Sequence, residues 1–273
     1  MISGGWDWDP SLYSGSAAYY ARGRAAYPDT LAEAFTAELG LDGTGRLLDV
    51  GCGPGSLTLL LAGRFDETVG LDADPDMLAE AARRAADAEV RTCRWVHRRA
   101  EELPADLGEF RLVTFAQSFH WLDRPAVAAA VHGMLAAGGA CAHVHAMTHQ
   151  GVDPDDQAPP HDAITDLVRR YLGSVRRAGQ GVLPDGTAAG EPEIYRAAGF
   201  RGPRRFEVPG RVVTKDADAV VAAVFSLSSA APHLFGDRRE AFEADLRQLL
   251  HEANPAGVFT ERLREISVDL WWP

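Results

Sequence analysis

The stretch Leu47 to Thr58, which reads LLDVGCGPGSLT, decides the fold. An apolar, strand-like run ends in the acid Asp49, and Gly51, Gly53 and Gly55 follow before residues that favour a helix. Glycine adopts positive φ at no steric cost and carries no Cβ atom, so the backbone can turn sharply and a ligand can approach it closely. The helix that begins here offers unpaired N–H groups and a positive dipole end, which suit an anionic group.

Three interpretations of this turn are open. A dinucleotide-binding turn would read G-x-G-x-x-G, but Ser56 stands at the sixth position and Gly55 comes one residue early. A plain glycine turn between a strand and a helix would bind nothing. The third interpretation rests on the pattern D-x-G-x-G-x-G, which resembles motif one of the class I S-adenosylmethionine (SAM)-dependent methyltransferases. This resemblance implies that the loop wraps the aminocarboxypropyl end of SAM and that Asp49 reaches its amino group, often through water.

A second acid follows the next expected strand. Residues 68–71 are apolar and strand-like, and Asp72 ends them about twenty residues beyond the glycine loop, where an acid can accept both ribose hydroxyls. We expect Asp72 and the adjacent Ala73 to contact the cofactor. Adenosyl and dinucleotide cofactors share this feature, so it indicates a nucleoside site without choosing between them. Asp74 followed by Pro75 predicts the N-cap and first turn of a helix.

The segment after the third expected strand, residues 90–97, continues the resemblance. In the methyltransferase family a pattern ending A-E-x-L-P lies beside the adenine, and Ala100 and Glu101 match it. Arg98 and Arg99 stand where many relatives carry glycine or aspartate. The resemblance therefore implies that Ala100 and Glu101 border the cofactor.

The fourth expected strand, residues 111–116, runs into QSFHWLD. FRLVTFAQSFHWLDR resembles the branch that includes trans-aconitate and ubiquinone/menaquinone-type methyltransferases, and the resemblance spans roughly residues 13 to 147. Ligands of open α/β sheets bind outside the carboxyl ends of the strands, so Gln117, His120 and Trp121 are expected at the site. Gln117 is assigned to the cofactor and Trp121 to the substrate. His120 is the candidate general base because its intrinsic pKa lies near neutrality, or it only shapes the pocket beside Trp121.

An expected helix at residues 16–27 precedes the glycine loop. Tyr20, Arg24 and Tyr27 are spaced to share one helical face. Arg24 could simply extend along an amphipathic helix with its charge in water. The Y…R…YP pattern also resembles the lid of small-molecule methyltransferases, which implies that Arg24 pairs with the SAM carboxylate and that Tyr20 walls its methyl end. This lid could include Trp6, Trp8 and Tyr13.

The fifth expected strand reads CAHVHAMTH and places His143 and His145 on one face. With His149 nearby, these residues could be read as metal ligands, but the acid ligands and second spacing of a known site are missing, so no metal is expected. Polar side chains satisfied at a sheet edge are the favoured interpretation, with His145 as a substrate-pocket wall.

Seven expected strands alternate with helices, which predicts an α/β fold with a mostly parallel sheet covered by helices on both faces. The resemblance implies a Rossmann-like methyltransferase sheet in which the last strand, EISVDLWW, is antiparallel. We divide the chain into an N-terminal lid and helices (1–40), a SAM-binding core (41–150), a variable, partly helical substrate cap (151–200), and a segment that completes the sheet (201–273). The sixth strand is expected at residues 204–213.

Composition narrows the partners. A formal net charge of −12 over 273 residues disfavours nucleic acid, because phosphates would be repelled. Three widely spaced cysteines fit a reducing cytoplasm, and neither a secretory signal nor a membrane span is expected. A small-molecule methyl acceptor is the expected partner, with the chain a monomer or homodimer.

The resemblance implies a SAM-dependent methyltransferase acting on a small molecule, such as a specialised metabolite. Because fold does not fix function, an enzyme that uses SAM for cyclisation or similar chemistry is the alternative, followed by an NAD-dependent oxidoreductase and a non-catalytic SAM-binding protein. Neither the acceptor nor O-, N- or C-methylation is written in the residues.

Overall fold

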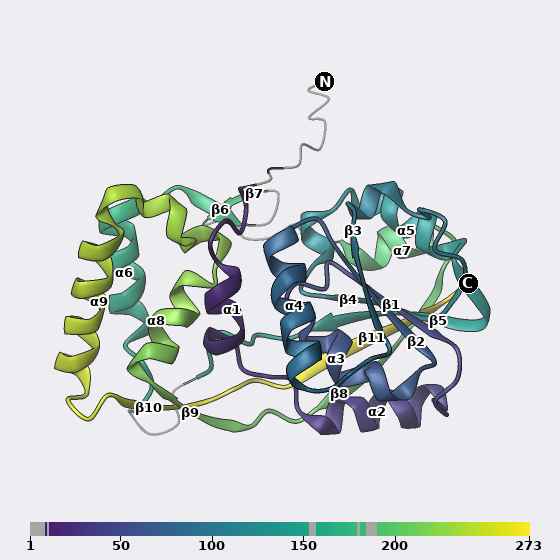
Figure 1. The fold of residues 1–273 in the computed structure, drawn as a ribbon, viewed down its shortest axis with the longest axis horizontal. Coiled ribbons are helices and arrows are strands. Elements are labelled where there is room, and N and C mark those ends of the chain that lie inside the picture. Colours follow the sequence, from purple (N-terminus) through teal and green to yellow (C-terminus); the bar gives the residue numbers. More distant parts are fainter. Residues whose placement is uncertain (1–8, 10, 153–156, 179–180, 184–189) are drawn as a thin grey trace.

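A computed structural model describes residue 9 and residues 11–152, 157–178, 181–183 and 190–273. One lobe is a sheet covered by helices and the other is helical, with α1 (Ala17–Gly23) lying between them (Figure 1). Trp6 and Trp8, expected in the lid, lie outside the described residues, as do parts of the expected cap at 151–200.

The large sheet has seven strands. Their order is β3 (Cys93–His97), β2 (Glu67–Asp72), β1 (Arg46–Val50), β4 (Phe110–Ala116), β5 (Leu135–His145), β11 (Ile266–Trp272) and β8 (Arg201–Val208). β1 is parallel to β2 and β4, whereas β11 is antiparallel to both β5 and β8. The prediction of a mostly parallel sheet with one antiparallel strand is confirmed.

Alternate residues of each strand face opposite sides of the sheet, and both sides are buried. On β1, Leu47 packs with the core under α2 (Asp29–Leu39) and α3 (Ser56–Leu61). Leu48 packs with the core under α5 (Arg124–His132) and α7 (Glu191–Ala197). α4 (Pro75–Asp87) contacts β2 and β3, and Asp74 caps it by accepting from the N–H groups of Asp76 and Met77. Helices therefore cover both faces, as the strand patterns predicted.

The helical lobe is built from two segments distant in the chain. α6 (His161–Leu172) shares one core with α8 (Ala217–Phe225) and α9 (Arg239–Ala253), joined by the turns η4 (Ser228–Ala230) and η5 (Pro232–Arg238). We expected the helices after residue 200 to complete the sheet. They pack on α6 instead, because α8 is apolar around most of its surface and needs partners on several sides.

The fold contains no single helix, within its described ranges, that is long and apolar enough to cross a membrane. One pair of helices, Ala217–Phe225 and Ser228–Ala253, has the length and composition of a membrane span when taken together, but the pair is bent by 101°.

The sixth expected strand is divided in the structure. β8 ends at Val208, and β9 (Val212–Asp216) leaves the sheet to pair antiparallel with β10 (Val258–Arg262), a strand that the sequence analysis missed. Pro209 and Gly210 separate β8 from β9, and proline cannot donate to a continuing ladder. β9 and β10 connect the two lobes (Figure 1), and β6 (Arg176–Ala178) and β7 (Gly181–Leu183) form a short antiparallel hairpin.

Candidate functional site

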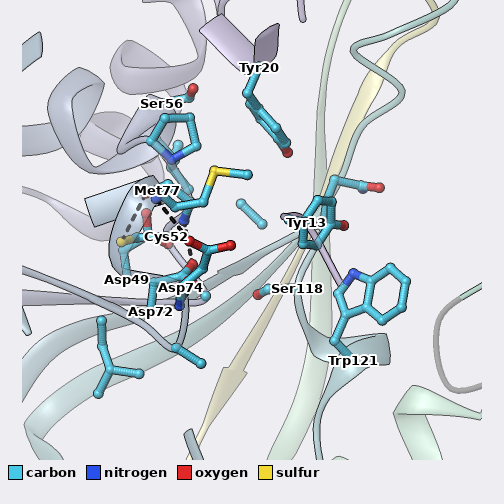
Figure 2. Close-up of a pocket in the computed structure, with 18 of the residues that line it drawn as sticks. Tyr13, Tyr20, Asp49, Cys52, Ser56, Asp72, Asp74, Met77, Ser118 and Trp121 are labelled. Carbon is cyan, nitrogen blue, oxygen red and sulfur yellow. Dashed lines mark hydrogen bonds between the residues drawn. The ribbon is translucent and has the colours of Figure 1, made fainter. Parts of the chain in front are cut away.

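A cleft with about 1060 Å³ of empty space, part of which is open solvent, lies beyond the carboxyl ends of β1, β2 and β4, and Figure 2 shows some of the residues that line it. This is the edge at which ligands of open α/β sheets bind. Most of the residues predicted for the site line it: Tyr20, Arg24, Asp49, Gly51, Gly53, Asp72, Ala73, Ala100, Glu101, Gln117 and Trp121. Gly55, His120 and His145 are not among its lining residues.

The glycines of the turn have different reasons for being glycine. All three have positive φ, 68° at Gly51, 53° at Gly53 and 73° at Gly55. A Cβ added at Gly51 would lie 2.5 Å from Ser118 Cβ, and one at Gly55 would lie 2.7 Å from Trp95 Cη2. A Cβ at Gly53 would meet nothing within 4 Å. Gly55, expected to contact the cofactor, therefore packs against Trp95, whereas Gly53 leaves open space for a ligand.

Two acids hold the floor of the cleft. Asp49 is 1% exposed and accepts from Thr58 Oγ1 at 2.6 Å and Thr114 Oγ1 at 2.8 Å, and burial raises its pKa. Asp72 accepts from the Gly53 N–H at 2.7 Å and from the Asp74 N–H at 2.9 Å. Burial raises the pKa of Asp72 to about 6. The bond from the Gly53 N–H to Asp72 joins the glycine turn to the tip of the neighbouring strand.

Arg24 follows the last turn of α1 and lines the cleft. Its guanidinium donates from Nε to Ser226 Oγ at 2.8 Å, from Nη2 to the Ser226 carbonyl at 3.1 Å and from Nη1 to His149 Nδ1 at 3.1 Å. It also lies over the Tyr20 ring, 4.8 Å from the centroid. None of the described carboxylates forms an ion pair with Arg24. It can therefore take an anionic group, for which the guanidinium offers a planar set of donors.

Aromatic side chains form the other side of the cleft. Figure 2 shows Tyr13, Tyr20 and Trp121 across from Asp72 and Met77. Tyr13 meets Trp121 edge to face, with ring centroids 5.8 Å apart. Burial, followed by the nearby Tyr20, raises the pKa of the Tyr13 phenol, so it stays protonated. Faces of aromatic rings attract cationic groups.

The segment after β4 closes over the glycine turn. Gln117 has a φ of 58°, unusual for a residue other than glycine, and its Nε2 donates to the Val144 carbonyl at 3.3 Å. Ser118 Oγ donates to the Val50 carbonyl at 2.5 Å. Glu101, at the turn η2 (Ala100–Glu102), accepts from the Asp123 N–H at 2.9 Å. Backbone in a sparsely populated conformation is typical of functional sites.

His120 is not among the residues that line the cleft. It belongs to the turn η3 (Phe119–Trp121), where successive side chains point in directions about 120° apart, so Trp121 enters the cleft and His120 does not. Its ring lies 5.0 Å from that of Trp121. Burial, with the nearby Arg124 charge, lowers the pKa of His120 to about 4. The structure therefore does not place His120 on the cleft surface, which favours the alternative that it shapes the pocket beside Trp121.

His145 does not line the cleft either. We placed it as a substrate-pocket wall, but its Nε2 lies 3.2 Å from Asp269 Oδ2 and its ring stacks on His143 with centroids 4.3 Å apart. The reason is that β11 pairs with β5 and brings Asp269 opposite His143. His145 is therefore occupied within the sheet.

Several lining residues had no assigned role in the sequence analysis. Met77 could have been found, since it lies on the buried face of a helix with a clear amphipathic pattern. Cys52 and Ser118 adjoin assigned residues. Leu12 and Thr148 carry no sequence signal, because only the return of distant chain segments brings them to the cleft.

The strand order, the reversed β11 and acids at adjacent strand tips around a glycine turn define the class. This is a Rossmann-like α/β fold with the geometry of a nucleoside-cofactor site.

Residues 47–139 match the family described as a methyltransferase domain. Over 83 residues the chain is 39% identical to trans-aconitate 2-methyltransferase of Mycobacterium tuberculosis, covering 30% of this chain and 29% of that one. Over 109 residues it is 37% identical to the ubiquinone biosynthesis O-methyltransferase of Psychrobacter arcticus, covering 39% and 42%. The chain thus spans less than half the length of these curated relatives. The YcgJ protein of Bacillus subtilis shares the fold, with a TM-score of 0.51 at 16% identity over 90% of this chain and 99% of that one.

Over residues 47–139 the chain is therefore similar to the methyltransferase-domain family, and the cosubstrate that this similarity implies is SAM. The residues fit this molecule. The space beside Gly53, which a side chain there would fill, is open to a ligand. The Asp72 carboxylate lies at the expected strand tip, and Arg24 has no acidic partner within the described ranges. A zwitterionic nucleoside needs donors and acceptors distributed in this way.

Proposed function

We propose that this protein transfers the methyl group of SAM to a small-molecule acceptor. The observation that carries the proposal is the distribution of charge in the cleft. Asp49 and Asp72 line it from β1 and β2, and Arg24, which follows α1, lines it together with the aromatic side chains of Tyr13, Tyr20 and Trp121. This arrangement suits a ligand with a ribose, an amino acid end and a sulfonium.

Each lining residue has a role in this proposal. Asp72 accepts the ribose hydroxyls, and Arg24 pairs with the amino acid carboxylate. Ala100 and Glu101 border the adenine, and Gly53 gives the ligand access to the turn. Asp49 faces the amino group through water, since its two oxygens already accept from Thr58 and Thr114.

The cosubstrate supplies an electrophilic methyl group when bound. The chain supplies orientation, and holding two reactants in line provides a large share of the acceleration. Tyr13, Tyr20 and Trp121 exclude water and face the cationic end. No histidine lines the cleft in the described part of the chain, so the proposal relies on alignment of the acceptor rather than on a histidine base.

The relatives support a small-molecule acceptor, because their names specify trans-aconitate and ubiquinone biosynthesis. The family match ends at residue 139, before the helical lobe. We therefore do not infer which acceptor this chain methylates from the acceptors of these relatives.

Calorimetry with SAM, S-adenosylhomocysteine and NAD tests the cofactor. We expect both adenosyl compounds to bind and NAD not to bind, and binding of NAD without SAM would overturn the proposal. Incubation with SAM and candidate acceptors should then yield S-adenosylhomocysteine together with a methylated product. Conversion of a substrate that requires SAM but releases no S-adenosylhomocysteine would favour cyclisation or a similar reaction instead.

A further inference from the structure

A second cavity, with about 550 Å³ of empty space that includes open solvent, lies in the helical lobe between α6 and α8. It shares no lining residue with the cofactor cleft. Its walls are apolar and are formed by Ile164 and Val168 of α6 and by Val220, Val224 and Leu227 on or after α8. An apolar body of a small molecule would fit between these two helices.

One end of this cavity is polar and contains Lys215, which is only 8% exposed. Its Nζ forms an ion pair with Glu261 Oε1 at 2.5 Å and donates to the His149 carbonyl at 3.0 Å. An ammonium group has three N–H donors. The third has no partner among the residues that the structure describes, although Lys215 lines the cavity.

His149 supplies a second donor at the same end. Its Nδ1 must accept from Arg24 Nη1, because a guanidinium has no acceptor, and in a neutral imidazole the proton then lies on Nε2. Burial, followed by the charges of Arg24 and Lys215, lowers the pKa of His149 to about 3, so the ring is neutral at pH 7. Its Nε2–H is left available to an occupant of the cavity.

The charge at this end is net positive. Glu261 is fully buried, forms an ion pair with Lys215, and accepts from His161 Nε2 at 3.0 Å and from the Gly151 N–H at 2.8 Å. Its charge offsets that of Lys215. The Arg24 charge next to His149 has no acidic side chain as a counterpart within the described ranges, and the SAM carboxylate would offset it only when SAM is bound.

We propose that this cavity binds a small monocarboxylate with an apolar body. The apolar body lies between α6 and α8, and the carboxylate accepts from Lys215 Nζ and His149 Nε2. Hydrogen bonds from a charged donor to a carboxylate are stronger than those to a neutral amide, so the charge of the ligand matters. The site is distinct from the cofactor cleft and does not depend on the proposed methyl transfer.

The test compares para-toluate with its neutral isostere para-toluamide by titration followed with ligand-observed NMR. On the full chain we expect para-toluate to bind roughly tenfold more tightly or better. Thr165→Phe places an aromatic ring into the cavity from α6 and should weaken para-toluate binding by roughly tenfold or more. Arg170→Phe, at an exposed position of the same helix, is the matched control and should leave binding within about twofold.

Gly53→Val separates the two sites. It should remove SAM binding and leave para-toluate affinity unchanged, whereas Thr165→Phe should do the reverse. Equal affinity for para-toluate and para-toluamide would overturn the proposal, and so would unchanged binding of para-toluate to Thr165→Phe. Loss of para-toluate binding in Gly53→Val would mean that the probe binds in the cofactor cleft, which would also overturn it. If Thr165→Phe fails to fold, crystals soaked in para-bromobenzoate decide the question. An anomalous bromine peak between α6 and α8 supports the site, and a peak only elsewhere rejects it.

Discussion

The Asp72 carboxylate accepts the backbone N–H of Gly53 at 2.7 Å, and this bond joins the tip of β2 to the glycine turn after β1. The same carboxylate holds the Asp74 N–H at the start of α4. One side chain thus sets the positions of the turn and of the next helix, and it also faces the cleft.

Asp72 makes cofactor binding sensitive to pH. Burial raises its pKa to about 6, and the ionised form is the better acceptor for ribose hydroxyls. We expect SAM affinity to fall as the pH drops below about 6, by up to tenfold per pH unit. Calorimetric measurement of SAM affinity at pH values above and below 6 checks this prediction. Asp72→Asn should bind SAM weakly, and its affinity should not change with pH. A flat profile for the unmodified chain would contradict the assignment.

The same pKa also affects folding. Because the folded-state pKa is raised above the ordinary value of 3.8, the folded chain holds this proton more tightly than the unfolded chain does. The contribution of Asp72 to stability is therefore most favourable below pH 3.8 and decreases as the pH rises through about 6. The difference between Asp72→Asn and the unmodified chain in urea unfolding should change with pH in this window.

Gly53→Val should remove SAM binding while the fold persists. The valine side chain would occupy open space in the cleft, and a β-branched residue at a φ of 53° costs about 1–2 kcal/mol. Gly51→Val is the contrasting variant, because its Cβ would meet Ser118 at 2.5 Å and destabilise the fold further. Urea unfolding and calorimetry measure the two effects, and unchanged SAM affinity in Gly53→Val would refute the role of the turn.

Gly23→Ala tests the seating of α1 on the helical lobe. An added Cβ would overlap the backbone of α8 at Ala222 and Ala223, so α1 must shift, at a cost of about 1–3 kcal/mol. Because Tyr20 and Arg24 belong to this segment, SAM affinity should fall with stability. Gly63→Ala meets no atom within 4 Å and is the control. Equal behaviour of the two variants in thermal unfolding would show that the close contact is not needed.

Arg24→Met should weaken binding of S-adenosylhomocysteine by roughly tenfold to a hundredfold, through loss of a charge-assisted contact to the carboxylate. Adenosine lacks that carboxylate, so its affinity should remain within about twofold. Calorimetry with both ligands distinguishes loss of the specific contact from general damage. An equal loss for adenosine would mean that Arg24 acts through its bonds to Ser226 and His149.

His120→Phe should leave turnover within about threefold, because the imidazole does not line the cleft and general-base catalysis would require contact with the reacting group. Trp121→Ala, which opens the cleft wall, should lower turnover more. Steady-state kinetics with an identified acceptor measures both. A decrease of about a hundredfold in His120→Phe with intact SAM binding would restore its assignment as the base.

The predicted acids and the glycine turn line the cleft, because the position of each depends on only a few neighbouring residues. A strand that ends in Asp49 or Asp72 puts its carboxylate at the carboxyl edge whatever the rest of the chain does. His120 and His145, which were expected at the site, do not line the cleft, because their positions depend on more than neighbouring residues. The direction of His120 depends on the turn η3, and the partner of His145 is Asp269, 124 residues further along the chain.

The sequence by itself determined the alternation of strands and helices, the Rossmann-like turn and the acids at the strand tips, since φ preferences, capping and hydrophobic periodicity act over a few residues. Only the tertiary structure decided that α6 joins α8 and α9, that Arg24 meets Ser226 and His149, and that a second cavity exists. The physical reason is that an apolar helix face shows that it must be buried, but does not specify which distant element buries it.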